Sequence, residues 1–210
     1  MLIFDLDGTL LNTVKDLHIA LNHALKTHGF PEKTEAETQM LLGNGIDILV
    51  ADAIPNGKEN PKFPETYATF KEYYSQHLND YTAPYDGILP LLSALKARNI
   101  KMGIVSNKFD EGVKALAAQY FTNLIKHAQG TSDKVKKKPS PDAVFALIKE
   151  LNAENEKNIY IGDSDVDMAT AQNAGLPCIS VSWGFRSRKF LESCGANPII
   201  DTPEELLKYI

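Results

Sequence analysis

Cysteine is scarce in this sequence, and long apolar stretches are absent. The 210 residues include two cysteines, Cys178 and Cys194. Neither has neighbours at zinc-ligand spacing, so the sequence predicts neither a disulfide framework nor structural zinc. No apolar run is long enough to span a bilayer, and the first predicted strand starts at the N-terminus with no signal peptide before it. These absences predict a reduced, cytoplasmic protein with no membrane partner.

Positive charge is also in short supply. Lysine and arginine total 22 against 27 acidic residues, which gives a net charge of -5. Domains that bind nucleic acid carry a basic patch or stripe, so this balance argues against a nucleic-acid partner. The densest basic run, 134–138, is short, and we expect its members Lys134, Lys136 and Lys137 to be solvated. The GxGxxG and phosphate-loop lysine motifs are missing as well.

Short apolar runs that end in polar or glycine residues recur along the chain and predict strands. They cover 2–4, 102–105, 159–161, 178–181 and 198–200. Segments of helical period lie between them, at 88–97, 111–119, 141–151 and 166–174. This alternation predicts an α/β fold with a Rossmann-like parallel sheet covered on both faces. Ligands bind beyond the carboxyl ends of such strands, where Asp5, Ser106 and Asp163 are expected.

Residues 14–81 interrupt this alternation. They contain amphipathic helical stretches at 14–27, 46–53 and 65–78 and no convincing strand. The connector 82–87, which contains proline and glycine, then leads back to strands and helices. We therefore predict a catalytic core of residues 1–13 and 82–210, with a helical cap domain of residues 14–81 inserted after the first strand. Because both linkers meet the site edge of the sheet, the cap can act as a lid.

Two carboxylates, Asp5 and Asp7, stand at the end of the first predicted strand. Buried carboxylates are costly unless they are paired or bind a cation, so two at the tip of a core strand indicate a site. Aspartate and glycine are also common in turns, and residues 5–8 alone would fit an ordinary strand-end turn. In a site, one carboxylate can act as nucleophile and the other as general acid and base.

Four motifs, in order and over essentially the whole chain, resemble the haloacid dehalogenase-like superfamily. They are Asp5-Leu6-Asp7-Gly8-Thr9-Leu10, Ser106 after an apolar strand, Lys138 before Pro139-Ser140-Pro141-Asp142, and Gly162-Asp163-Ser164-Asp165-Val166-Asp167. Each is weak to moderate alone, and their shared order makes the match specific. Within the superfamily the chain is most similar to the phosphoglycolate phosphatases, on segments 42–45, 82–87, 106–108 and 182–186. It departs from them at Asn12-Thr13, where relatives commonly have Asp-Ser in the hinge.

The resemblance implies a Mg²⁺-dependent phosphatase that works through an aspartyl-phosphate, with 2-phosphoglycolate as the favoured substrate. Asp5 would be the nucleophile, Asp7 the general acid and base, and Lys138 a catalytic cation. Mg²⁺ would be bound by Asp5, Asp163 and the backbone carbonyl of Asp7. Asp167 would orient a metal-bound water or Lys138.

A further acid in the fourth motif competes with Asp167 for this indirect role. Asp165 ranks below Asp167 because it departs from the family spacing. The sequence leaves open which of the two assists the metal.

The remaining candidates concern the phosphate and the substrate. The Ser106 hydroxyl and the Asn107 amide can hold phosphoryl oxygens, and we count Ser106 as catalytic. Ser106 is also typical of a helix N-cap. Asn44 stands in a Gly-Asn-Gly segment that fits a substrate loop and a plain tight turn equally well. We take Thr9, Asn44, Asn107 and Arg186 as candidate substrate-binding residues.

Other functions fit parts of the pattern. A sugar phosphomutase shares the architecture but needs an aspartyl-phosphate that survives water, and Thr9 favours hydrolysis. Dehalogenases and phosphonatases do not use the acid at Asp7. A non-catalytic phosphate-binding protein or a phospho-accepting switch would have no need of a proton shuttle for water. The expected partner is a small phosphorylated metabolite, and the sequence is compatible with a monomer or a homodimer.

Overall fold

The structure, a computed structural model, describes residues 1–132 and 135–210. Lys134, expected to be solvated, lies outside the described residues. The chain forms two compact units, one of residues 1–12 and 84–210 and the other of residues 13–83. In residues 1–132 and 135–210, no helix combines the length and apolar character needed to cross a membrane.

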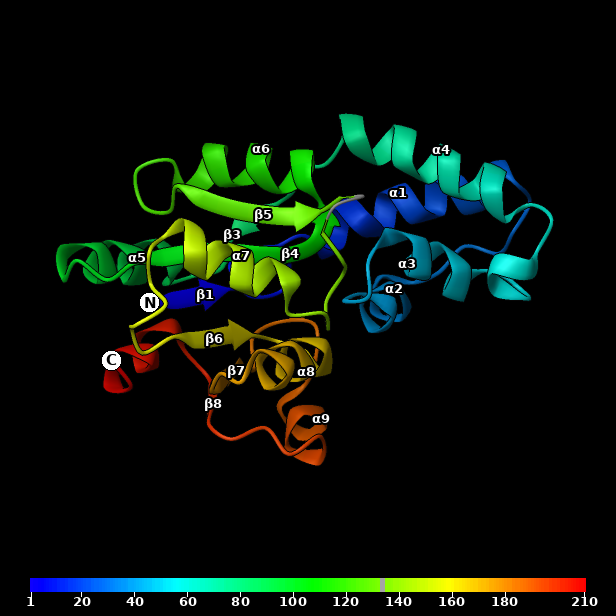
Figure 1. The fold of residues 1–210 in the computed structure, drawn as a ribbon. Coiled ribbons are helices and arrows are strands. Elements are labelled where there is room, and N and C mark those ends of the chain that lie inside the picture. Colours follow the sequence, from blue (N-terminus) through cyan, green and yellow to red (C-terminus); the bar gives the residue numbers. More distant parts are fainter. Residues whose placement is uncertain (133–134) are drawn as a thin grey trace. The chain divides into compact units, whose positions relative to one another are not determined.

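The first unit, which we call the sheet unit, is built on six parallel strands in the order β5-β4-β1-β6-β7-β8 (Figure 1). The strands are β1 Leu2–Phe4, β4 Met102–Phe109, β5 His127–Thr131, β6 Ile159–Gly162, β7 Cys178–Val181 and β8 Ile199–Ile200. β1 pairs with β4 on one side and β6 on the other, and its three residues are at most 2% exposed. A strand buried on both faces needs a continuous apolar run, which is the pattern at 2–4. The predicted α/β class with a Rossmann-like sheet is confirmed.

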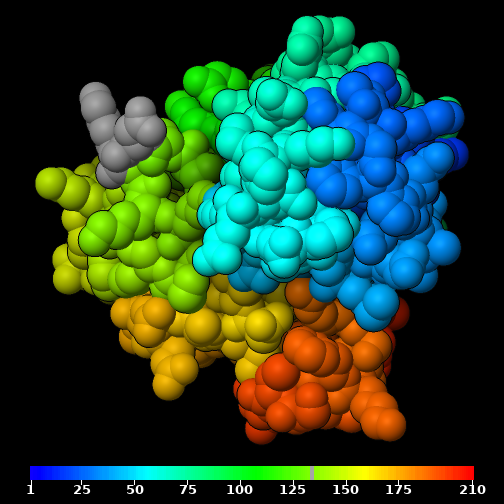
Figure 2. Space-filling model, turned by 90° about the vertical axis from the view of Figure 1, so that its right-hand side faces the viewer, coloured from blue at the N-terminus to red at the C-terminus, as the bar shows by residue number. Residues whose placement is uncertain are grey.

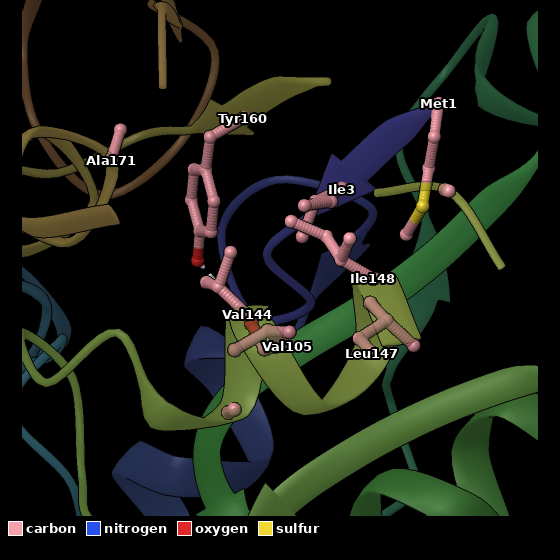
Figure 3. Close-up of a cluster of buried hydrophobic side chains, with 10 residues drawn as sticks. Met1, Ile3, Val105, Val144, Leu147, Ile148, Tyr160 and Ala171 are labelled. Atoms are coloured by element: carbon pink, nitrogen blue, oxygen red, sulfur yellow. Dashed lines mark hydrogen bonds between the residues drawn. The ribbon is translucent and has the colours of Figure 1, made fainter. Parts of the chain in front are cut away.

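Helices follow the strands of the sheet unit. They are α5 Ile88–Ala97, α6 Asp110–Phe121, α7 Asp142–Glu150, α8 Asp165–Ala174, α9 Arg188–Ser193 and the 3₁₀ helix η2 Pro203–Lys208. Figure 3 shows side chains of α7 and α8 over one face of the sheet, where Val144, Leu147 and Ala171 share a buried cluster with Ile3 and Tyr160. Apolar spacing along α7 therefore fixes which side of that helix covers the sheet.

β4 corrects two sequence expectations. The strand does not end at Val105 but continues to Phe109, and α6 begins at Asp110 with Phe109 as its N-cap. Ser106 therefore lies inside the strand and does not cap the helix. The β4–β5 register shifts between Val105 and Phe109, so the ladder is irregular where the strand continues past its apolar run. Local irregularities of this kind can re-aim side chains. β5, with the sequence HAQGT, has no apolar run and was not identified from the sequence.

The second unit, which we call the helical unit, contains α1 Val14–Thr27, α2 Glu35–Leu41, α3 Ile46–Ala53, the 3₁₀ helix η1 Gly57–Glu59 and α4 Phe63–Gln76. α1 packs against α2 and α4 through a buried stripe that includes Leu17, Leu21 and Leu25, spaced four apart. α2 begins with a capping box, in which Thr34 and Glu37 satisfy each other's backbone amides. Strands β2 Leu11–Asn12 and β3 Ala83–Pro84, at the ends of the insertion, pair with each other.

Candidate active site

Three neighbouring strands bring the core motifs to one edge of the sheet. In Figure 1 the arrows of β4, β1 and β6 point the same way, and the register aligns Phe4 with both Ile104 and Ile161. Asp5 follows β1 directly, Asp163 follows β6, and β4 continues from Ile104 to Ser106. The carboxyl ends of parallel strands are where such sheets bind ligands. The tertiary structure thus gathers motifs that are more than 150 residues apart in the sequence.

Three carboxylates form a buried cluster at this edge. Asp5, Asp163 and Asp167 each offer an oxygen within 4.8 Å of the others, and they are 7%, 1% and 0% exposed. Burial, followed by the charge of Asp167, raises the pKa of Asp5 well above its ordinary value. The same two causes raise the pKa of Asp163 to about 7. A divalent cation would offset both causes, and an all-oxygen donor set fits a hard cation.

Lys138 is the cation that the cluster already contains. Its Nζ lies 2.8 Å from Asp5 Oδ1 and 2.7 Å from Asp167 Oδ1. Burial alone would lower the pKa of Lys138, but the carboxylates of Asp167 and Asp5 raise it well above its usual range. The Asn107 side chain holds the backbone of Lys138, because Lys138 N–H donates to Oδ1 at 2.7 Å and Nδ2 donates to Lys138 O at 3.3 Å. β4 thereby positions the lysine against the cluster.

Asp167 is held by its own helix and by the strand before it. Its Oδ2 accepts from the Ser164 hydroxyl at 2.6 Å and the Ser164 amide at 3.1 Å, in the capping box that starts α8. The buried Tyr160 hydroxyl donates to Oδ1 at 3.2 Å. A side chain at Gly162 would place its Cβ 2.3 Å from Asp167 Cγ, so this approach requires glycine. Neither Tyr160 nor Ser164 was identified as a site residue from the sequence, and the Ser-x-x-Asp capping pattern was the available signal for Ser164.

Asp7 is held by β4. Lys108 Nζ lies 3.1 Å from Asp7 Oδ1, and the Ser106 hydroxyl donates to Oδ2 at 3.4 Å. Lys108 is only 4% exposed, and its amide donates to Ser106 Oγ at 3.2 Å. Sequence reasoning gave Lys108 no role. The available signal was its spacing of two from Ser106, because alternate strand residues share a face.

Asp163 is enclosed by fixed donors and by glycines. Thr9 Oγ1 donates to its Oδ1 at 3.0 Å, and the Phe185 amide donates to its Oδ2 at 2.7 Å. Gly8 has a φ of +88°, and a Cβ there would lie 2.5 Å from Asp163 Oδ2. Trp183 donates its indole N–H to the Thr9 carbonyl at 3.0 Å. The Thr9 hydroxyl therefore faces the acid cluster.

Arg186 and Asn44 are the two candidates from other segments of the chain. Arg186 Nε is 3.5 Å from Asp165 Oδ1 at the start of α8, and its guanidinium stands 5.7 Å from the Phe190 ring. In the space-filling view, gold and orange segments of the C-terminal part of the chain lie side by side (Figure 2). Asn44 is exposed between α2 and α3 in the helical unit. Substrate binding by Thr9, Asn44, Asn107 and Arg186 remains a prediction.

Comparisons with known proteins agree with the geometry. Residues 2–181 match the sequence model of the haloacid dehalogenase-like hydrolases. A phosphoglycolate phosphatase of Aquifex aeolicus is 32% identical over 191 residues, which cover 88% of this chain and 85% of that protein. One of Rhodospirillum rubrum is 32% identical over 207 residues, which cover 95% of this chain and 86% of that protein.

Solved structures show the same relationship. A crystal structure of a protein assigned as a phosphoglycolate phosphatase, from Lactobacillus delbrueckii subsp. bulgaricus, superimposes with a TM-score of 0.95 and 34% identity. The match covers 100% of this chain and 97% of that one. The family match confirms the resemblance drawn from the four motifs and the prediction that the protein is an enzyme. The chain belongs to the haloacid dehalogenase-like hydrolase family.

Proposed function

We propose that the protein is a Mg²⁺-dependent phosphatase that hydrolyses a small phosphomonoester, with 2-phosphoglycolate as the favoured substrate. The observation that carries this proposal is the buried cluster of Asp5, Asp163 and Asp167, two of whose members contact the single ammonium of Lys138. Such a cluster is unfavourable by itself and becomes useful when it receives a cation and a phosphate. Relatives that match most of the chain carry the name phosphoglycolate phosphatase.

Asp5 is the proposed nucleophile. Its Oδ1 accepts from the Leu6 amide at 2.7 Å and lies 2.8 Å from Lys138 Nζ, so both contacts orient the carboxylate. Attack of a carboxylate oxygen on phosphorus forms an aspartyl-phosphate and expels the substrate's alcohol. Water then attacks the phosphorus of this intermediate, which releases inorganic phosphate and regenerates the carboxylate.

Asp7 is the proposed general acid and base. It gives a proton to the leaving alkoxide in the first step and takes one from the attacking water in the second. The contacts with Lys108 and Ser106 fix the carboxylate two residues after the nucleophile, on the β4 side of the site. This proton shuttle favours a hydrolase over a stable phospho-accepting switch.

Charge balance supports the proposed requirement for a metal. The site contains four carboxylates, Asp5, Asp7, Asp163 and Asp167, against two ammonium groups, Lys108 and Lys138. The excess of negative charge would repel a phosphate dianion. Mg²⁺ held by Asp5, Asp163 and the Asp7 carbonyl would supply the missing positive charge, with Asp167 keeping Lys138 in place.

The two units take different roles in this proposal. The sheet unit carries the chemistry, and the helical unit serves as a cap whose segment around Asn44 contributes to substrate choice. Ser106, Asn107, Thr9 and Arg186 are proposed to contact the phosphate side of the substrate.

Phosphate release from a panel of phosphorylated metabolites, with and without Mg²⁺, tests the proposal. Turnover that requires Mg²⁺ and is highest with 2-phosphoglycolate is expected, and Asp163→Ala should raise the Mg²⁺ concentration needed. Ca²⁺, which prefers about six to eight ligands at longer distances, should compete with Mg²⁺ without supporting turnover. A single stoichiometric labelling without turnover would instead indicate a switch, and conversion of one sugar phosphate into another without phosphate release would indicate a mutase.

A further inference from the structure

Two buried lysines divide the charged site between them. Lys138 contacts Asp5 and Asp167, the nucleophile side, whereas Lys108 contacts Asp7, the acid side. The side chain of Lys108 is only 2% exposed and that of Asp7 is 16% exposed. An ordinary surface ion pair forms without the cost of desolvating a lysine. Lys108 is therefore a buried ammonium held directly against the proposed general acid.

The strand holds Lys108 in this place. The β4–β5 register shifts between Val105 and Phe109, so the irregular part of β4 includes Lys108. Its carbonyl accepts from the Thr131 hydroxyl at 3.3 Å, and a Cβ on Gly130 would lie 2.6 Å from that carbonyl. The backbone at Lys108 is thus packed closely against β5. Irregularities such as β-bulges are over-represented next to active sites, where they re-aim a side chain or end the pairing.

The position of Asp7 places Lys108 near the leaving group. A general acid must come within roughly 3 Å of the oxygen it protonates. In the proposed mechanism that oxygen is the ester oxygen of the substrate, so the group attached to it lies on the Asp7 side. Lys108 Nζ is 3.1 Å from the Asp7 carboxylate. Atoms one or two bonds beyond the ester oxygen therefore fall near this ammonium.

We propose that Lys108 recognises an anionic leaving group, by binding a carboxylate that stands one carbon away from the ester oxygen. An ammonium has three N–H donors, so it can bridge Asp7 and a substrate carboxylate. A neutral leaving group cannot form this contact between an ammonium and a carboxylate. Lys108 would therefore be a specificity-determining residue. This inference rests on the proposed phosphatase function and on the role given there to Asp7.

Two matched substrates test the inference in the wild-type enzyme. 2-Phosphoglycolate and 2-hydroxyethyl phosphate have the same chain length and differ in a carboxylate against a neutral alcohol. A charge-assisted contact should give the carboxylate substrate a preference in kcat/KM of about 10-fold to 100-fold. Equal kcat/KM values for the two substrates would overturn the inference without any variant.

Variants then assign the preference to Lys108. Lys108→Met should lower kcat/KM for 2-phosphoglycolate by about 10²-fold and should abolish the preference. The loss that is specific to the carboxylate substrate should appear in KM, whereas a loss through Asp7 should lower kcat for both substrates. Lys108→Arg keeps the charge and should retain most of the preference. Lys114→Met, a change at an exposed lysine of α6, is the matched control and should behave as wild type. Circular dichroism on each variant checks the fold.

The outcomes separate this inference from the proposed function. If Lys108→Met lowers turnover of both substrates equally, Lys108 acts only through Asp7 and the inference is wrong, while the phosphatase proposal stands. If the wild type releases no phosphate from either substrate or from p-nitrophenyl phosphate, the phosphatase proposal fails and the inference fails with it.

Discussion

Both units bury carboxylates, but the groups that surround these carboxylates differ between the two units. In the helical unit Asp16 is 2% exposed and accepts from the Tyr81 amide at 3.0 Å, from the Thr82 amide at 2.8 Å and from the Thr82 hydroxyl at 2.7 Å. In the sheet unit Asp5 and Asp163 instead face a third carboxylate, and their pKa values rise. Hydrogen-bond donors favour the charged form, whereas neighbouring carboxylates oppose it.

This difference separates Asp16 from the carboxylates of the proposed catalytic site. Asp16 ties the first helix of its unit to the segment that ends it, and its donors come from within that unit. The sheet-unit cluster instead keeps like charges together, an arrangement that lowers stability unless a ligand is bound. Burial alone would have ranked the two kinds of carboxylate equally. The identity of their neighbours decides between them.

The largest expected effect is the loss of activity in Asp5→Asn. The amide keeps the size of the side chain but is a poor nucleophile, so turnover should fall by about 10³-fold or more. Stability without metal should be unchanged or higher, because one charge leaves a crowded cluster. Steady-state turnover and thermal unfolding on one preparation measure both. A folded variant with near wild-type turnover would remove Asp5 from the mechanism.

Asp16→Asn should have the opposite effect, with lower stability and nearly unchanged turnover. The NH₂ group of asparagine cannot accept a hydrogen bond from the backbone amides that contact Asp16. The free energy of unfolding should therefore fall by about 2–3 kcal/mol. Urea denaturation measures this loss. The turnover of p-nitrophenyl phosphate by the folded variant should stay within about twofold of wild type, since Asp16 does not bind the reacting atoms. Lost turnover at unchanged stability would show that Asp16 is not a structural carboxylate, and the contrast between the two units would be wrong.

The pH dependence of stability should reveal the raised pKa of the carboxylate cluster in the sheet unit. A carboxyl group whose folded pKa is raised holds its proton more tightly when folded, so it destabilises the fold as pH rises above the unfolded pKa. For Asp163 this loss should develop between about pH 4 and pH 7, the range between its ordinary pKa and its folded value of about 7.

The measurement compares thermal unfolding at pH 5 and pH 8 with a chelator present. Wild type should lose more stability at pH 8 than Asp163→Asn does, and Mg²⁺ should restore the wild type at pH 8 by binding the ionised cluster. The same pH slope in the wild type and the variant would show that Asp163 is not the group responsible.

The smallest effect is expected at Asn44 of the helical unit. Asn44→Ala should shift the preference among phosphorylated metabolites by a few-fold, about 1 kcal/mol or less, while p-nitrophenyl phosphate turnover changes little. Gln76→Ala, at another exposed position of that unit, serves as the control. A change confined to p-nitrophenyl phosphate would count against a role for this segment in substrate choice.

Much of the fold follows from local pattern. Helices α1, α3 and α5 begin and end at the predicted residues, as does strand β7, because each has a clear apolar period and a defined boundary. The exceptions are instructive. β5 has no apolar run, and β4 continues beyond its apolar segment, where its register with β5 shifts. Both features depend on pairing with a neighbouring strand.

For the site, local sequence was enough to indicate which residue types stand at which strand ends. Order and spacing placed Asp5, Asp7 and Asp163 at the carboxyl ends of parallel strands, because an apolar run that stops at a carboxylate marks both the strand and its exit. Lys138 was recognisable from its motif. These inferences needed only local sequence and the general geometry of parallel sheets.

The pairing of the charged groups, by contrast, depends on three-dimensional packing. Lys138 pairs with Asp5 and Asp167. Lys108 pairs with Asp7, and Arg186 lies beside Asp165. Ion pairing between residues 21 to 133 positions apart depends on strand register, on the register shift in β4 and on the start of α8. No local pattern encodes these features, because the free energy of a buried charge is set by the neighbours that packing brings to it.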